Sequence, residues 1–284
     1  MRHRFPTSVL NALSQEHIGP QFWGTAHKYR QPVGGLAMAD NPVRMSRLRS
    51  PAGHVRMVPL DHGVSIGPAA GITDPAATLA AVADGATCVT VHKGLWRHVA
   101  PHADRLGLLL HLSASTDVAP DPNDKRLVAT VEEALRLGFD GVSTHCNLGA
   151  ATEAHMVESL GRVSTACDDW GVPHVAMVYP RGPKVADPFD PVLVAHAARL
   201  GAELGADVVK VPYTGDPDSF RPVVEGAGVP VVVAGGPKRD SFDGLLEALR
   251  GARAAGAAGV SIGRNVFQHD DPAAAIAAIA DIFP

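Results

Sequence analysis

The sequence predicts a single (β/α)8 barrel, the TIM-barrel fold, over residues 51–284, preceded by a basic N-terminal extension over residues 1–50. The chain has 284 residues, and one such barrel typically needs about 250, although two ordinary domains would also fit this length. Its composition, 46% hydrophobic with a net charge of −4, is typical of a soluble globular protein. From residue 55 onward, short β-branched runs alternate eight times with Ala/Leu-rich amphipathic stretches, the pattern of βα units around a parallel sheet.

The eight expected strands read as near-continuous apolar runs, as parallel strands buried on both faces should. They span residues 55–60, 87–92, 107–112, 139–145, 173–179, 207–211, 229–234 and 259–262. The amphipathic stretches predict helices near 75–84, 127–137, 152–169, 190–204, 241–255 and 272–282, with weaker helical segments at 98–105 and 217–226. An open doubly wound sheet is the alternative, but the DHGVSIGP sequence after the first strand is not the G-x-G-x-x-G turn that such a sheet favours.

The extension over residues 1–50 has no sustained periodicity and a net charge of +5. A basic arm of this kind could bind nucleic acid or an acidic surface. It lacks the interleaved aromatic residues of a base-stacking platform, so we expect no nucleic-acid partner and an extension that packs on its own or a neighbouring subunit. A transit peptide is disfavoured because serine is scarce and glycine and proline are interspersed.

Apolar runs and cysteines indicate the compartment. No apolar run approaches the roughly 18–20 residues that span a bilayer, and the N-terminus lacks a continuous apolar signal core, so we expect a cytoplasmic protein that does not bind a membrane. Cys88, Cys146 and Cys167 are an odd number without a C-x-x-C pair, which argues against a disulfide framework and a structural zinc site. We expect them to be buried thiols.

Polar residues gather at the carboxyl ends of the expected strands, where barrels of this kind carry their chemistry. In strand order they are Asp61 and His62, His92 and Lys93, His111 and Ser113, His145 and Asn147, Tyr179 and Arg181, Lys210, then Gly235, Gly236 and Lys238, and finally Gly263 and Arg264. The pattern predicts an active site at the mouth of the barrel.

The lysines point to Schiff-base chemistry. Four of the six lie at or just past expected strand ends, which surface solubility does not explain. A lysine among apolar neighbours and other cations loses its proton more readily, and the neutral amine attacks carbonyl groups. Lys210 lies within the apolar run DVVKVPY, where a surface lysine has no place. The alternative is a buried lysine paired with a carboxylate for structure alone.

The last two loops predict a phosphate site. Gly235 and Gly236 follow the seventh strand, and Gly263 and Arg264 follow the eighth. Glycines let backbone amides approach phosphate oxygens, and arginine and the nearby Lys238 supply charge. We therefore expect a small phosphorylated substrate.

The histidines support a rival hypothesis. His62, His92, His111 and His145 end four consecutive strands and could converge on a divalent metal, as in hydrolases and metal aldolases. No H-x-H pair ends the first strand, however, and a metal mechanism leaves Lys210 without a role. We expect no metal and no cofactor, with the imidazoles bonded to one another, to the backbone or to substrate hydroxyls.

Several motifs in order resemble the archaeal-type class I aldolases, a family that includes fructose-bisphosphate aldolase and 2-amino-3,7-dideoxy-D-threo-hept-6-ulosonate synthase. The motifs are VPLDHG at 58–63, HLSAST at 111–116, PDPNDK at 120–125, AMVYPRG at 176–182, VVKVPYTGD at 208–216 and GRNVFQ at 263–268. The resemblance implies that Lys210 forms the Schiff base, that Tyr179 and Asp61 handle protons, and that the last two loops bind phosphate. It also implies a homo-oligomer, with a decamer among the expected assemblies.

HLSAST, PDPNDK and THCNLG at 144–149 look more like the heptulosonate synthases than the sugar-bisphosphate aldolases. This likeness implies aspartate 4-semialdehyde as the acceptor and dihydroxyacetone phosphate, or a deoxyketose phosphate, as the donor. The product would feed 3-amino-4-hydroxybenzoate or 3-dehydroquinate type aromatic biosynthesis. A mixed polar rim suits a carboxylate and an ammonium better than a second phosphate, and its expected residues are His62, Lys93, His145, Asn147, Arg181 and Lys184. A fructose-bisphosphate aldolase and a non-catalytic phosphoketose-binding barrel are the alternatives.

Overall fold

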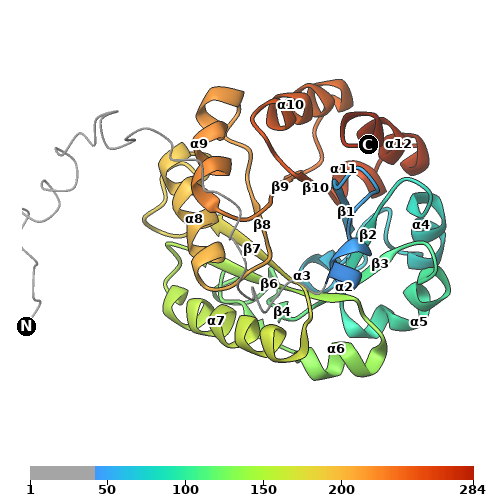
Figure 1. Ribbon diagram of the computed structural model, residues 1–284, viewed down its shortest axis with the longest axis horizontal. Coiled ribbons are helices and arrows are strands. Elements are labelled where there is room, and N and C mark those ends of the chain that lie inside the picture. Colours follow the sequence, from blue (N-terminus) through green and yellow to red (C-terminus); the bar gives the residue numbers. More distant parts are fainter. Residues whose placement is uncertain (1–41) are drawn as a thin grey trace, which may run out of the picture. The chain divides into compact units, whose positions relative to one another are not determined.

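The computed structural model describes residues 42–284, so the expectations for residues 1–41 lie outside the described residues. Eight parallel strands form a closed barrel in the order β1-β10-β9-β8-β7-β6-β3-β2, and helices surround them (Figure 1). Their bounds are β1 Val55–Pro59, β2 Cys88–Val91, β3 Gly107–His111, β6 Gly141–Leu148, β7 His174–Pro180, β8 Val208–Val211, β9 Val231–Ala234 and β10 Gly259–Ser261. The predicted barrel is confirmed, and every expected strand overlaps one of these.

Aspartate–proline pairs begin four of the described helices, which are α4 (Pro75–Val82), α8 (Pro191–Glu203), α9 (Pro217–Ala227) and α12 (Pro272–Ile282). In each, the aspartate before the proline accepts hydrogen bonds from backbone amides of the first turn. Proline loses no hydrogen bond at the first helical position, and its φ already suits a helix. The outer layer also contains α6 (Val131–Leu137), α7 (Glu153–Trp170) and α10 (Phe242–Ala254).

Alternate residues of each strand face the helices or the inside of the barrel. Val209 and Val211 of β8 belong to the large hydrophobic cluster between the barrel and its helices. Val208 belongs to a second cluster, which fills the inside of the barrel together with Met57 and Leu109. Lys210 is the next inward residue of β8, so the period of two directs its side chain into the barrel.

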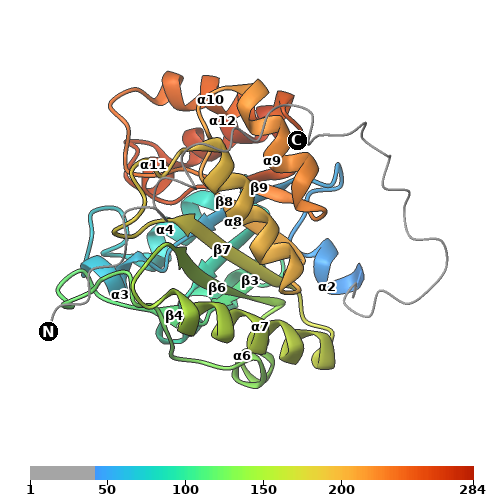
Figure 2. The same cartoon turned by 90° about the vertical axis from the view of Figure 1, so that its left-hand side faces the viewer.

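Residues 42–50, which we assigned to the extension, close the amino-terminal end of the barrel. The short helix α2 (Pro42–Ser46) and the turn after it bury Met45 and Leu48 in the inner cluster. Arg47 donates to two backbone carbonyls of the connection between β2 and β3. Figure 2 shows α2 at one end of the barrel, opposite α3 and α11. The barrel therefore begins before residue 51, the boundary that composition suggested.

Short elements at the mouth were absent from the sequence prediction. They are α3 (His62–Ile66), α11 (Arg264–Phe267) and an antiparallel pair formed by β4 (Ser113–Ala114) and β5 (Arg126–Leu127). Because Arg126 and Leu127 pair as a strand, the helix expected from residue 127 begins only at Val131, where Thr130 caps it. The helical segment expected at 98–105 is divided between α5 (Trp96–Val99) and η3 (Ala100–His102), because Pro101 cannot donate the amide hydrogen bond that a continuous helix needs. A further short helix, η2 (Lys93–Leu95), precedes α5.

The three cysteines are buried free thiols, as expected. Burial raises the pKa of Cys88 and of Cys146 to about 12, so neither is a thiolate near neutral pH. Over residues 42–284, no helix combines the length and the apolar character that crossing a membrane requires.

A buried histidine makes the stability of the barrel sensitive to acid. His174 Nε2 lies 2.8 Å from Thr144 Oγ1 and Nδ1 lies 2.9 Å from Ser164 Oγ, and burial lowers the pKa of His174 from 6.5 to about 3. The unfolded chain takes up this proton below pH 6.5 and the folded chain only near pH 3, so the stability is full above pH 6.5 and falls between these values. We expect the free energy of unfolding to fall by up to about 1.4 kcal/mol per pH unit through this group.

Urea unfolding at about pH 7.5 and about pH 5 checks this expectation. His174→Gln keeps a donor and an acceptor for Thr144 and Ser164 but does not titrate, so it should lose less stability on acidification than the parent. The exposed His196→Gln is the matched control and should retain the parent's pH dependence. The same pH dependence in the parent and in His174→Gln would contradict the prediction.

Candidate active site

A cavity of about 740 Å3 opens at the carboxyl ends of the strands. Its wall consists of the inward residues at these ends, and they include His92, His111, His145, Tyr179, Lys210 and Ser261. Three of them, His111, Tyr179 and Lys210, follow an inward apolar residue of the inner cluster two positions earlier in the strand, and these apolar residues are Leu109, Met177 and Val208. The same alternation that builds the inner cluster therefore builds the cavity wall above it.

Lys210 lies in this wall with 6% of its surface exposed. Its Nζ lies 3.9 Å from Met177 Sδ and 6.0 Å from the centre of the Tyr179 ring. Among the described residues, no carboxylate comes within 4.0 Å of this Nζ, so the structure gives no support to the alternative of a lysine buried as half of an ion pair. A buried amine without a close counter-ion is suited to attack on a carbonyl.

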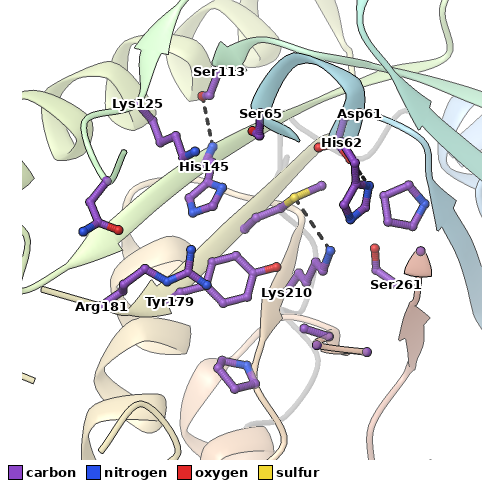
Figure 3. A pocket seen from close by; sticks show the side chains of 18 of the residues that line it. Asp61, His62, Ser65, Ser113, Lys125, His145, Tyr179, Arg181, Lys210 and Ser261 are labelled. Carbon is purple, nitrogen blue, oxygen red and sulfur yellow. Dashed lines mark hydrogen bonds and ion pairs between the residues drawn. The ribbon is translucent and has the colours of Figure 1, made fainter. Parts of the chain in front are cut away.

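Tyr179 is half-buried on β7, between Lys210 and the rim. Figure 3 shows its hydroxyl directed toward Lys210. Its ring lies 5.0 Å from the His145 ring, and the Arg181 guanidinium carbon lies 5.5 Å from its centre. Packing on both sides fixes the ring, so the hydroxyl has a defined position beside the amine.

Asp61 follows β1 on the other side of the cavity, beside two histidines. Its carboxylate oxygens lie 3.4 Å from His62 Nδ1 and 3.6 Å from His111 Nε2. Burial acts to raise the pKa of Asp61, but His111, His62, Lys210 and His92 together lower it below its ordinary value. Asp61 is therefore a carboxylate near neutral pH and can accept a proton.

The neighbouring histidines are neutral in this setting. Burial lowers the pKa of His111 to about 4, although the charge of Asp61 acts to raise it. His111 Nδ1 lies 2.8 Å from Ser143 Oγ, and its ring packs edge-on against His92 with 5.3 Å between the ring centres. Over residues 42–284, no three His, Cys, Asp or Glu side chains gather closely enough to hold a metal ion.

The two predicted glycine loops meet at the mouth, and Gly235, Gly236, Gly263 and Arg264 all line the cavity. Gly236 has φ +68°, a conformation that favours glycine. A Cβ on Gly263 would lie 2.6 Å from His62 Cε1 and 2.9 Å from the Pro59 carbonyl oxygen, so only glycine fits there. Arg264 lines the cavity, and its Nε is buried without a hydrogen-bond partner among the described residues.

Asn265 joins these two loops and was not singled out from the sequence. Its amide nitrogen donates to the carbonyls of Gly235 and Pro237 at 3.0 and 2.8 Å, and its oxygen accepts from the Arg239 amide at 2.8 Å. Because one buried side-chain amide makes three hydrogen bonds, it fixes the spacing between the loop after β9 and the loop after β10.

Lys125 is a further cavity residue that sequence reasoning did not select. It lies in the connection between β4 and β5, lines the cavity and is 9% exposed. Its Nζ donates to Ser115 Oγ at 2.5 Å. The PDPNDK motif that ends in Lys125 contributes to the family resemblance, but nothing local in this motif indicates that the hairpin folds this lysine inward.

Four predicted site residues do not line the cavity. Lys93 Nζ donates to the Val128 carbonyl and pairs with Glu133 at 3.2 Å. Lys238 Nζ donates to the Gln268 carbonyl, and Lys184 is exposed on the loop after β7. Asn147 is fully buried behind the wall, where its oxygen lies 2.8 Å from His145 Nε2 and its nitrogen donates to the Asn123 carbonyl. The three lysines lie outside the wall because they follow the strands into loops whose direction the tertiary packing sets. Asn147 belongs to β6 itself, and its amide group is used in the contacts with His145 and Asn123.

The fold and the site together define a class of protein, because a buried lysine inside a barrel with a tyrosine and a carboxylate beside it is the arrangement of a Schiff-base aldolase. Residues 55–269 match the family described as DeoC/LacD family aldolase. The chain belongs to this family and is a class I aldolase.

Similar proteins narrow the branch of the family. A Streptomyces griseus protein named 2-amino-4,5-dihydroxy-6-oxo-7-(phosphonooxy)heptanoate synthase is 47% identical over 231 residues, covering 80% of this chain and 83% of that protein. The 2-amino-3,7-dideoxy-D-threo-hept-6-ulosonate synthase 1 of Archaeoglobus fulgidus is 47% identical over 81% of this chain and 85% of its own. A solved structure of a Schiff-base-forming fructose-1,6-bisphosphate aldolase has a TM-score of 0.80 and 32% identity, covering 85% of this chain and 99% of that one. The predicted likeness to the heptulosonate branch is confirmed.

Proposed function

We propose that this aldolase condenses dihydroxyacetone phosphate with aspartate 4-semialdehyde to give 2-amino-4,5-dihydroxy-6-oxo-7-(phosphonooxy)heptanoate. The observation that carries the proposal is Lys210, a buried amine that no carboxylate of the described residues approaches within 4.0 Å, in a cavity whose wall also holds Tyr179 and Asp61. The name of the S. griseus relative supports this product, and the expected role of the product is a precursor in aromatic biosynthesis.

The donor reacts first. The Lys210 amine adds to the C2 carbonyl of dihydroxyacetone phosphate, and loss of one water leaves a protonated Schiff base. Removal of a proton from C3 then gives an enamine, because the iminium nitrogen withdraws the electron pair of the C–H bond. Asp61, whose lowered pKa keeps it a carboxylate near neutral pH, is a suitable base.

The enamine carbon attacks the aldehyde carbon of the acceptor, so one carbon–carbon bond forms and the aldehyde oxygen takes up a proton. The Tyr179 hydroxyl, directed toward Lys210, is placed to supply it (Figure 3). One water then hydrolyses the Schiff base and frees the Lys210 amine. The water lost in the first half of the cycle is balanced by the water used in the second.

The phosphate of the donor is proposed to lie between the two glycine loops, with Arg264 as its charged ligand. Arg264→Ala should raise the donor KM about 10- to 100-fold, because a charge-assisted hydrogen bond to phosphate is lost, while the acceptor KM changes little. Steady-state kinetics with each substrate varied in turn measures both constants. A loss of the same size with unphosphorylated dihydroxyacetone would argue against this clamp, because that donor offers no phosphate for Arg264 to bind.

Acceptor choice tests the proposed function as a whole. Dihydroxyacetone phosphate is supplied with aspartate 4-semialdehyde or with glyceraldehyde 3-phosphate, and kcat/KM is compared. We expect a clear preference for the semialdehyde. A preference for glyceraldehyde 3-phosphate would make the chain a fructose-bisphosphate aldolase, the activity of the structure that is 32% identical.

A further inference from the structure

Within the part of the chain that the structure describes, the charged groups of the cavity outnumber those that the donor uses. Its cations are Lys125, Arg181, Lys210 and Arg264, and its carboxylates are Asp61 and Asp117. The proposed donor chemistry uses Lys210, Arg264 and Asp61. Lys125, Arg181 and Asp117 have no part in it, so they are available to the second substrate.

Lys125 is held ready for an anion. Ser115 Oγ accepts from Lys125 Nζ and donates to the Pro122 carbonyl at 2.6 Å, so one polar contact orients the ammonium. Among the described residues, no carboxylate lies within 4.0 Å of Lys125 Nζ, and burial, followed by the charge of Arg181, lowers the pKa of Lys125. A buried ammonium without a close counter-ion is costly, and an anionic ligand would offset that cost.

Arg181 lies on the same side of the cavity as Lys125 and His145, away from Asp61 and Ser261 (Figure 3). Its backbone amide donates to the Leu148 carbonyl at 2.8 Å, which fixes the start of the loop after β7. Both cations line the cavity, and beside burial the charge of Arg181 lowers the pKa of Lys125.

Asp117 supplies the opposite charge at the rim. Its backbone amide donates to the Ser65 carbonyl at 2.9 Å, which anchors the loop after β4 to α3. Asp117 lines the cavity, and its charge acts to raise the pKa of both Lys125 and Arg264 against the burial that lowers it. A carboxylate in this position attracts an ammonium and repels a second phosphate.

We propose that Lys125, Arg181 and Asp117 form a subsite for the amino-acid head of the acceptor aldehyde. Lys125 and Arg181 bind its carboxylate, and Asp117 faces its ammonium. This inference rests on the proposed function and names the residues that select the acceptor. The aldehyde end then points toward Tyr179, which lies between Arg181 and Lys210 in Figure 3.

The test uses three acceptors with dihydroxyacetone phosphate. They are aspartate 4-semialdehyde, 3-aminopropanal, which lacks the carboxylate, and 4-oxobutanoate, which lacks the amine. Lys125→Met should lower kcat/KM about 10- to 150-fold with the first and third acceptors and little with 3-aminopropanal. Asp117→Asn should lower it with the two amines and spare 4-oxobutanoate. Arg126→Met, which removes the adjacent exposed cation paired with Asp124, is the matched control and should change none of these values.

The outcomes separate this subsite from the proposed function. Borohydride trapping with dihydroxyacetone phosphate shows that each variant folds and still reacts with the donor. If the parent uses aspartate 4-semialdehyde but Lys125→Met loses kcat/KM equally with all three acceptors, the proposed subsite is wrong and the proposed function stands. If the parent does not use the semialdehyde at all, both fail. Two results together would support the assignment. The loss in Lys125→Met should be confined to acceptors that carry a carboxylate, and Lys125→Arg should recover activity with these same acceptors.

Discussion

Replacement of Lys210 by Met or by Arg is expected to abolish both turnover and covalent trapping. Borohydride reduction of the parent in the presence of dihydroxyacetone phosphate should add the mass of the reduced donor to one peptide, that containing Lys210. Both variants should lose at least about a thousandfold in kcat, because the nucleophile that forms the intermediate is gone. Arg keeps the positive charge at this position, so its failure would show that the free amine is required.

The control for this experiment is the other lysine of the cavity. Lys125→Met should still yield the adduct on Lys210, because Lys125 lies in the connection between β4 and β5 and plays no part in Schiff-base formation. An adduct on Lys125, Lys93 or Lys238, or activity that a chelator abolishes, would overturn the assignment of Lys210. The absence of any adduct from an active parent would also do so.

Replacement of Tyr179 by Phe is expected to lower kcat about 100- to 10,000-fold, the range typical of a lost general acid or base. Phe keeps the ring that packs against His145 at 5.0 Å and under Arg181, so the wall of the cavity should be unchanged. Schiff-base trapping should therefore be retained while carbon–carbon bond formation is slow. Single-turnover kinetics after preincubation with the donor separates these two steps.

Tyr213→Phe is the matched control for this change. Tyr213 is buried against Phe220, with 5.1 Å between ring centres, and does not line the cavity. The variant tests whether loss of a buried tyrosine hydroxyl elsewhere in the barrel affects turnover. Near-normal kcat in Tyr179→Phe would transfer the proton step to Asp61 or to one of the histidines around it.

The electrostatics of the cavity explain why Asp61 is charged while the neighbouring His111 is neutral. Asp61 is a carboxylate because its pKa lies below its ordinary value, whereas His111 is neutral because burial, which outweighs the charge of Asp61, lowers its pKa to about 4. A base and a neutral hydrogen-bonding group therefore sit side by side at the same pH. The Asp61 carboxylate is well placed to take a proton from the donor.

The sequence alone was enough to predict the barrel and to single out Lys210 as the candidate nucleophile. Eight apolar runs alternating with amphipathic stretches leave few ways to bury both faces of parallel strands, so the fold could be predicted. Lys210 was also accessible to this reasoning, because a charge within an apolar strand is conspicuous wherever the strand lies. The glycines of the last two loops were found for a similar reason, since their place at the strand ends follows from the topology.

Only the tertiary structure decided which charged side chains enter the cavity. Lys93 and Lys238 follow strands directly, yet they bond to carbonyls outside the wall, whereas Lys125 reaches the cavity from a hairpin far from any predicted strand end. The same holds for residues 42–50, whose apolar side chains close the barrel although their sequence has no periodicity. Strand residues point inward or outward by a fixed period of two, but loop residues point where their packing partners direct them, and those partners are distant in the sequence.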